Sequence, residues 1–273
     1  MRIYCSQPPL PEGIDAEPTT TLEDADILWA GLSANVPPLY GLPRLRCVVT
    51  PTTGIDHVPA LPPGCQLLCL RGEREFLDTV HATAELTLGL LLAVVRQIPQ
   101  ANGSLADREQ FMGTELHGLN CGIIGRGRVG TQFGGYCEAL GMDVAYTDRD
   151  VTIAHLGRLL PWAAVVSIHI PLEGNERIVD STWFRQMKDT AIFLNTSRGG
   201  IVDNAALSEF LDRGGRAGID TLTHDEHATS IRQHAIVTPH VGGCTVRSRR
   251  RTDAFMVCKI NDWIAAHAAC CST

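Results

Sequence analysis

A short apolar run followed by a glycine-rich turn constrains the fold of this chain more than any other feature. Residues Cys121–Ile124 lead into the sequence GRGRVG at positions 125–130, which has the spacing Gly-x-Gly-x-x-Gly. In such a turn the first glycine permits a tight bend and the second lets a phosphate approach the backbone. The third lets the helix pack closely on the strand. We therefore predict a strand, a turn and a helix here, the start of a βαβ unit.

The next strand carries the acidic residue that a ribose-binding site needs. Asp148 ends this strand, within the spacing of about 20 residues expected for such an acid. Its carboxylate accepts hydrogen bonds from ribose hydroxyls and repels a 2′-phosphate, so NAD is favoured over NADP, although the adjacent Arg149 weakens that preference. The alternative is a glycine-rich turn that binds no ligand. The position of the turn between a strand and a helix, together with Asp148, disfavours it. The expected cofactor-binding residues here are Gly125, Gly127, Arg128, Val129, Gly130, Asp148 and Arg149.

Apolar runs of strand length alternate with helical patterns along the chain. Strands are expected at Arg2–Cys5, Ile27–Ala30, Cys47–Thr50, Gln66–Cys69, Cys121–Ile124, Asp143–Tyr146, Ala164–His169, Ala191–Asn195, Ala217–Asp220 and Ile236–Thr238. Helices are expected over Thr79–Gln97, Asn204–Asp212 and Thr245–Ala266. This alternation predicts an α/β fold with doubly wound parallel sheets. A length of 273 residues favours two domains.

Composition excludes several classes of protein. The net charge is −7, which argues against nucleic-acid binding. The ten cysteines show neither a Cys-x-x-Cys pair nor zinc-ligand spacing, so we expect no metal, free thiols and a reducing cytoplasm. The N-terminus lacks the pattern of a signal peptide, and the most apolar stretch, Leu86–Val95, is too short to cross a bilayer. We expect a cytoplasmic protein without membrane association.

Polar residues follow three of the later strands, at the sheet edge where α/β proteins bind ligands. Arg198 follows Ala191–Asn195, His240 follows Ile236–Thr238, and a group of acidic residues follows Ala217–Asp220. Reduction of a 2-oxo acid needs a cation for the substrate carboxylate and an acid that protonates the forming alkoxide. It also needs a group that orients this acid. The chain offers a candidate for each role.

Longer motifs resemble the D-isomer-specific 2-hydroxyacid dehydrogenases, and within them the phosphoglycerate dehydrogenase branch. The resemblance runs from Thr53–Asp56 to the final helix and is densest in Ala84–Thr87, Arg96–Ala101 and Phe111–Leu116. Motifs of this length, in the family's order, are highly specific.

The resemblance implies a role for each matching position. Arg198 matches the arginine that grips the substrate carboxylate and carbonyl oxygen, and His240 matches the catalytic acid/base. The backbone amides at Thr53 and Gly54 match a loop that cradles the carboxylate. Asp220 matches an aspartate near the nicotinamide. Other residues expected to line the cofactor are His169, Ile170, Pro171, Thr196, Ser197, Gly242 and Gly243.

The residue expected to orient the histidine departs from the family pattern. The family has a glutamate five residues after the Asp220 position, where this chain has Asp225 followed by Glu226. A carboxylate beside the imidazole of His240 would raise its pKa. By register we expect Asp225 in this role, with Glu226 as the alternative.

A second departure concerns the substrate. Phosphoglycerate dehydrogenases carry an arginine just before the carboxylate loop, where this chain has Thr50. Arg71 and Arg74 could supply a replacement charge. Glu73 and Glu75 alternate with them, however, so this run is expected to be a solvated loop.

The expected domains are a Rossmann NAD-binding domain, residues 103–243, and a flavodoxin-like substrate domain, residues 1–102 with 244–273, with the active site in the cleft between them. The resemblance implies a homodimer that interconverts a D-2-hydroxy acid and its 2-oxo acid with NAD. One alternative is a dehydrogenase for a phosphonate or other specialised acidic 2-oxo acid. Another is an NAD(H)-binding corepressor or sensor with little turnover.

Overall fold

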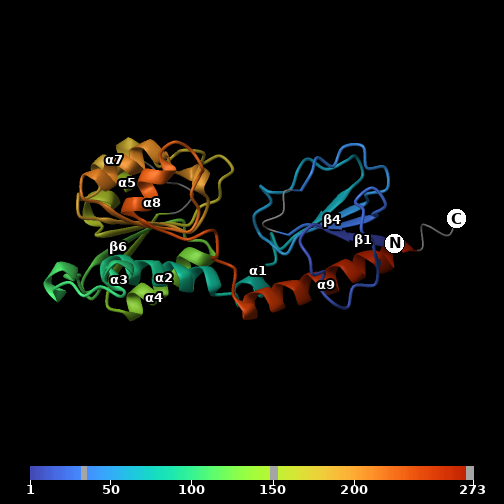
Figure 1. Ribbon diagram of the computed structural model, residues 1–273, viewed down its shortest axis with the longest axis horizontal. Helices are drawn as coiled ribbons and strands as arrows, with labels where there is room; N and C mark the ends of the chain where they lie inside the picture. The colour runs from blue at the N-terminus through green and yellow to red at the C-terminus, as the bar shows by residue number, and fades with distance from the viewer. Residues whose placement is uncertain (32–35, 148–152, 269–273) are drawn as a thin grey trace. The chain divides into compact units, whose positions relative to one another are not determined.

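The structure, a computed structural model, describes residues 1–31, 36–147 and 153–268 (Figure 1). Contacts divide the chain into two compact units. Unit 1 comprises residues 1–80 and 246–273, and unit 2 comprises residues 81–245. Each unit is built on its own parallel sheet.

The sheet of unit 2 holds six parallel strands in the order β11-β10-β9-β8-β6-β7. The order reverses at β6, which has β7 on one side and β8 on the other. Ligands of open α/β sheets bind at such a reversal, beyond the carboxyl ends of the strands. The strands are β6 (Asn120–Ile124), β7 (Asp143–Thr147), β8 (Val165–Ile168), β9 (Ile192–Asn195), β10 (Arg216–Ile219) and β11 (Ile236–Val237).

Helices cover both faces of this sheet, so the unit is doubly wound (Figure 1). Helices α2 (Ala82–Val95) and α4 (Arg128–Ala139) pack on one face, and α3 (Ile98–Ala101) follows α2. The other face carries α5 (Ile153–Trp162), α6 (Ser181–Gln186), α7 (Asn204–Asp212) and α8 (Ala228–His234). Two short 3-10 helices, η1 (Arg108–Phe111) and η2 (Gly199–Ile201), complete the unit.

Unit 1 has five parallel strands in the order β2-β1-β3-β4-β5. This is the flavodoxin-like order expected for the smaller domain. The strands are β1 (Arg2–Cys5), β2 (Glu17–Pro18), β3 (Ile27–Trp29), β4 (Cys47–Val49) and β5 (Gln66–Leu68). Both sheets are parallel throughout, which confirms the predicted α/β class.

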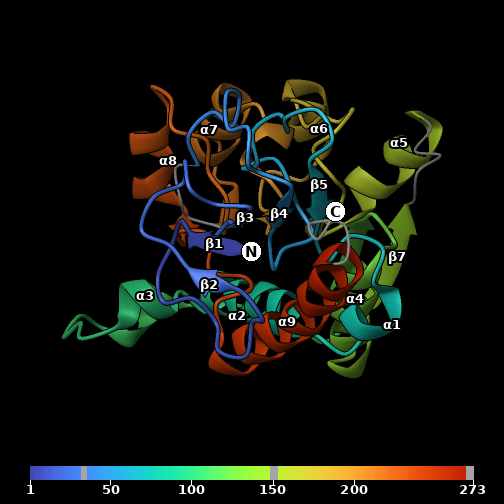
Figure 2. The ribbon, with the colours of Figure 1, turned by 90° about the vertical axis from the view of Figure 1, so that its right-hand side faces the viewer.

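The two faces of the unit 1 sheet are covered differently. Helices α1 (Arg74–Leu77) and α9 (Val246–Ala268) pack on one face, where the rings of Phe76 and Phe255 stack with centroids 4.3 Å apart (Figures 1 and 2). The other face is covered by loop residues such as Leu39 and Leu61. Except for residues 19–26, the connections between these strands are rich in proline, which disfavours a helix interior. This explains why the described residues of the connections between strands form loops.

The division between the units differs from the domain boundary expected at residue 103. Helix α2 belongs to unit 2, where its buried residues pack against α4, β9 and β10. An apolar composition on most sides is typical of a buried helix, but it does not indicate which sheet the helix packs on. Residues 74–95 are apolar and long enough to cross a membrane by length and composition alone. In this fold they are interrupted by residues 78–81, and α2 serves as a core helix.

Candidate functional site

The glycine-rich turn lies between β6 and α4, as the sequence predicts. Gly125 has a φ of +101°, and a Cβ there would lie 2.4 Å from the carbonyl oxygen of His169. A Cβ on Gly130 would lie 2.1 Å from the carbonyl oxygen of Gly125. Neither position can hold a larger residue without backbone movement. A Cβ on Gly127 would meet nothing within 4 Å, so the turn is open at the glycine that precedes α4.

This open turn fits the pyrophosphate of a dinucleotide. The amides of a helix's first turn have no carbonyl partner within the helix, so the start of α4 at Arg128 favours an anion. Val129 is half-buried in the same turn. At the end of β7 the hydroxyl of Thr147 is buried and has no hydrogen-bond partner among the described residues, one residue before the predicted ribose-binding acid. That acid, Asp148, and its neighbour Arg149 lie outside the described residues.

His169 lies at the end of β8, beside this turn. Its Nε2 is 2.8 Å from the hydroxyl oxygen of Ser167, and its ring is 5.6 Å from that of Phe133. Burial lowers the pKa of His169 to about 3, so the ring is neutral at physiological pH. Ile170 is half-buried next to Gly125, and the following Pro171 is exposed. His169 and Ile170 therefore lie beside the glycine-rich turn, and the contact of all three residues with the cofactor stays a prediction.

The segment after β9 carries three of the predicted residues. The amide of Ser197 donates to the side-chain oxygen of Asn195, and its hydroxyl donates to the carbonyl oxygen of Ile168 at 2.8 Å. The half-buried Arg198 donates from Nη1 to the carbonyl oxygen of Ser197. The buried hydroxyls of Thr196 and Thr87 are 2.8 Å apart. The segment is thus anchored to β8, to its own strand and to α2.

Thr87 is a residue that sequence reasoning missed. It is a buried polar residue in a helix composed mainly of apolar residues, and that contrast is the signal that could have identified it. Its hydroxyl also donates to the carbonyl oxygen of Thr83. Because it contacts Thr196, it supports the segment that carries Arg198.

His240 lies in the turn after β11 and has a φ of +56°. Residues other than glycine rarely adopt this left-handed backbone conformation, which costs about 1 kcal/mol or more. The amide of His240 donates to the carbonyl oxygen of Asp220 at 2.7 Å. The buried carboxylate of Asp220 accepts from the amides of Val241 and Gly242, both at 2.8 Å. The next residue in this turn, Gly243, is exposed.

The acidic residues expected to pair with His240 lie on the segment between β10 and α8. Asp225 is exposed and accepts hydrogen bonds from the side-chain amide of Asn204, at 2.9 Å, and from the amide of His227. Glu226 is 3.5 Å from the ring of His227. The contacts described for both carboxylates are thus with neighbours on this segment and with α7. Their role toward His240 stays a prediction.

In unit 1, Thr53 and Gly54 form part of the loop after β4. The hydroxyl of Thr52 donates to the carbonyl oxygen of Gly54 at 2.7 Å and is 3.0 Å from that of the buried Thr50. Thr50 is in turn 3.1 Å from the ring of His57. Thr50, where the family branch has an arginine, therefore supports the loop from inside.

The run 71–76, expected to be a solvated loop, is partly structured. Residues 74–77 form α1 because Phe76 and Leu77 pack against the core of unit 1. Arg71 donates from Nε to the carbonyl oxygen of Thr53 at 3.4 Å. Glu73 forms an ion pair with Lys259 on α9. The charge of Arg71 thus lies at the predicted carboxylate loop, while the nearby Glu73 pairs with Lys259.

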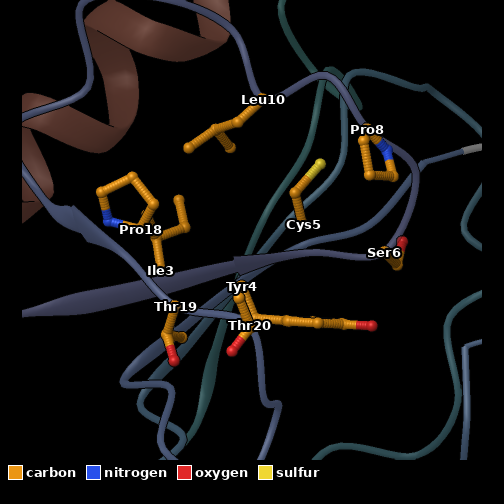
Figure 3. A pocket seen from close by; sticks show the side chains of 9 residues that line it. All are labelled: Ile3, Tyr4, Cys5, Ser6, Pro8, Leu10, Pro18, Thr19 and Thr20. Carbon is orange, nitrogen blue, oxygen red and sulfur yellow. The ribbon is translucent and has the colours of Figure 1, made fainter.

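A hollow of about 410 Å³ lies beside β1 in unit 1 (Figure 3). Its walls are mainly apolar, with Ile3, Leu10 and Pro18 around the thiol of Cys5. The residues that line it include none of the predicted site residues. Among the described residues, no group of three or more histidine, cysteine or acidic side chains could hold a metal ion.

Comparison with known proteins identifies the family. Residues 88–242, more than half of the chain, match the model for the NAD-binding domain of D-isomer specific 2-hydroxyacid dehydrogenases. The chain belongs to this family. The match confirms the predicted cofactor, NAD. Members of this family are NAD-dependent oxidoreductases that act on a CH–OH group.

Individual relatives agree with this assignment. A hydroxypyruvate reductase from Thermotoga maritima is 33% identical over 265 residues, covering 89% of this chain and 81% of the relative. A D-3-phosphoglycerate dehydrogenase from Methanocaldococcus jannaschii is 33% identical over 190 residues, covering 62% of this chain and 36% of the relative. The chain thus spans about a third of the latter protein.

The fold of a solved dehydrogenase matches nearly the whole chain. The structure of a D-lactate dehydrogenase from Aquifex aeolicus, complexed with NAD and lactic acid, superposes with a TM-score of 0.78 and 20% sequence identity. The match covers 98% of this chain and 97% of that chain. The fold of this dehydrogenase family is therefore present in both units.

Proposed function

We propose that this protein interconverts a D-2-hydroxy acid and its 2-oxo acid with NAD as the redox cofactor. The observation that carries the proposal is the placement of Arg198 and His240 after β9 and β11, in the unit that holds the open glycine-rich turn. All three features lie at the carboxyl ends of parallel strands of one sheet. In this proposal unit 2 is the NAD-binding domain and unit 1 the substrate domain.

Arg198 would hold the substrate by its carboxylate and carbonyl oxygen. Its guanidinium offers paired donors that match a carboxylate, and its backbone is anchored because Asn195 donates from Nδ2 to the carbonyl oxygen of Arg198 at 3.0 Å. The amides at Thr53 and Gly54 would add a second contact to the substrate carboxylate. NAD, when bound, supplies or accepts the hydride.

His240 would hold or release the proton at the substrate oxygen. In the reductive direction the protonated imidazole gives its proton to the alkoxide that forms at C2, and in the oxidative direction the neutral ring removes it. We propose Asp225 as the carboxylate that orients the ring, with Glu226 as the alternative. Either would raise the pKa of His240 and stabilise its protonated form.

Three further properties belong to the same proposal. Asp148 would favour NAD over NADP through its contact with the ribose. The protein would act in the cytoplasm, with no membrane or nucleic-acid partner. It would be a homodimer, as the family resemblance implies.

The activity is tested by NADH absorbance with a panel of 2-oxo acids that includes phosphorylated and phosphonate members. We expect NADH oxidation with at least one of them. His240→Ala should abolish turnover by removing the acid, while the dissociation constant for NADH, measured by fluorescence, stays nearly unchanged. Turnover of the variant comparable to wild type would contradict the role of His240. Tight NADH binding without activity on any substrate would favour the sensor function.

A further inference from the structure

Four donors from one short turn converge on a single residue, Asp220. The hydroxyl of Thr238 donates to Oδ1 at 2.6 Å, and the amide of Val241 donates to the same oxygen at 2.8 Å. The amide of Gly242 donates to Oδ2 at 2.8 Å. The amide of His240 donates to the main-chain carbonyl oxygen at 2.7 Å. Asp220 therefore holds the turn on both sides of His240.

The charge of Asp220 is stabilised inside the protein by these donors. The residue is 1% exposed, and the hydroxyl and two amides that reach its carboxylate are uncharged. Hydrogen bonds to an ionised acceptor are about twice as strong as those between neutral groups. The contact is also close, because a Cβ on Gly242 would lie 2.9 Å from Oδ2. Only glycine lets the backbone approach the carboxylate to this distance without movement.

The left-handed backbone of His240 explains why the donors converge. Three successive amides, at positions 240, 241 and 242, all donate to Asp220. When residues of left-handed conformation occur in a turn, consecutive amides can point inward and form a concavity that binds an anion. Here the amides at positions 241 and 242 bind the carboxylate of Asp220, while the amide at position 240 donates to its main-chain carbonyl oxygen. The conformation of the histidine and the charge of the aspartate are thus parts of one arrangement.

We propose that Asp220 is a positioning residue that fixes the backbone of His240 and so aims its ring for proton transfer. This inference rests on the proposed acid/base role of His240. It assigns Asp220 a role beyond the contact with the nicotinamide that the family resemblance implies. Asparagine cannot replace it, because Oδ1 and Oδ2 both accept hydrogen bonds. In either orientation the NH₂ group of an asparagine would face a donor.

The test uses the full chain with Asp220→Asn and a matched control, Asp180→Asn. Asp180 accepts from the amides of Thr182 and Trp183 at the start of α6, where asparagine is an equally good cap. We expect Asp220→Asn to lower kcat by about 100-fold, the scale of a misplaced catalytic group. It should flatten the pH profile of kcat/KM and leave the dissociation constant for NADH nearly unchanged. The control should keep all three properties.

Thr238 provides a second variant that leaves the carboxylate in place. Thr238→Val removes one donor and should lower kcat by about tenfold, and Thr238→Ser should restore it, since a hydrogen bond to a charged group has about this worth. This pair keeps the proposal testable if Asp220→Asn does not fold. If kcat is unchanged and only the NADH dissociation constant rises, Asp220 acts on the cofactor and the proposal is wrong.

Amide hydrogen exchange separates this proposal from the proposed function. In wild type the amides of Val241 and Gly242 should be protected, and Asp220→Asn should expose them while other amides of the sheet stay protected. If no 2-oxo acid is turned over but this difference is present, the hydrogen bonds between the turn and Asp220 exist and the proposed activity has failed. If both amides exchange equally fast in the two proteins, Asp220 does not hold the turn and the positioning role is refuted.

Discussion

At the scale of single residues, the half-buried ring of His169 predicts how the protein responds to acid. Burial lowers the pKa of His169 to about 3, whereas a histidine in an unfolded chain titrates near pH ~6.5. Below pH ~6.5 the imidazole of His169 therefore binds a proton in the unfolded state but stays neutral in the folded state. The contribution of His169 to stability is complete above that pH and falls by about 1.4 kcal/mol for each unit toward pH ~3.

We expect His169→Gln to reduce this dependence, because glutamine keeps a hydrogen-bonding group beside Ser167 and does not titrate. The measurement is the free energy of unfolding in urea between pH 4.5 and 7, for both proteins. The other titrating groups are common to the two chains, so the difference in slope reports His169. Equal slopes would contradict the low pKa.

The residues of the candidate site could be predicted to different degrees. The glycines of the turn were predictable because each has a distinct steric task that only glycine performs, and the structure shows these tasks for Gly125 and Gly130. The supporting contact of Thr87 was not, since it joins residues 109 positions apart. Sequence spacing carries no signal for such a contact.

At the scale of elements, α4 shows how a tertiary contact overrides helix propensity. It contains Gly134 and Gly135, and each glycine in a helix costs about 1 kcal/mol relative to alanine. The structure accounts for the first, because a Cβ on Gly134 would lie 1.9 Å from the hydroxyl oxygen of Tyr146 on β7. A Cβ on Gly135 would meet nothing within 4 Å.

These neighbours make a matched pair of variants. Gly135→Ala should stabilise the protein by up to about 1 kcal/mol through helix propensity. Gly134→Ala should destabilise it by about 1–3 kcal/mol through overpacking. Tyr146→Phe, which removes the nearest atom, should recover part of that loss in the double variant. Thermal unfolding measures all of them. Stabilisation by both alanines would show that Tyr146 does not pack against α4 as described.

At the scale of the whole molecule, the parallel sheets were predictable and the division of the chain was less so. Strand runs such as Arg2–Cys5 and the helix Asn204–Asp212 agree with the structure to the residue. The two-residue β2 has too little sequence to show a pattern. Helix α2 packs in unit 2 because of contacts with β9 and β10, distant in sequence. Its composition could not specify those partners.

The proposed activity is hydride transfer between NAD and C2 of a D-2-hydroxy acid. The most direct measurement incubates the protein with NADH carrying deuterium at both C4 positions and with the 2-oxo acids of the panel. The configuration and label of each product are then determined by NMR and chiral chromatography. We expect a D-2-hydroxy acid with deuterium at C2. A product of L configuration, or NADH binding without label in any product, would contradict it.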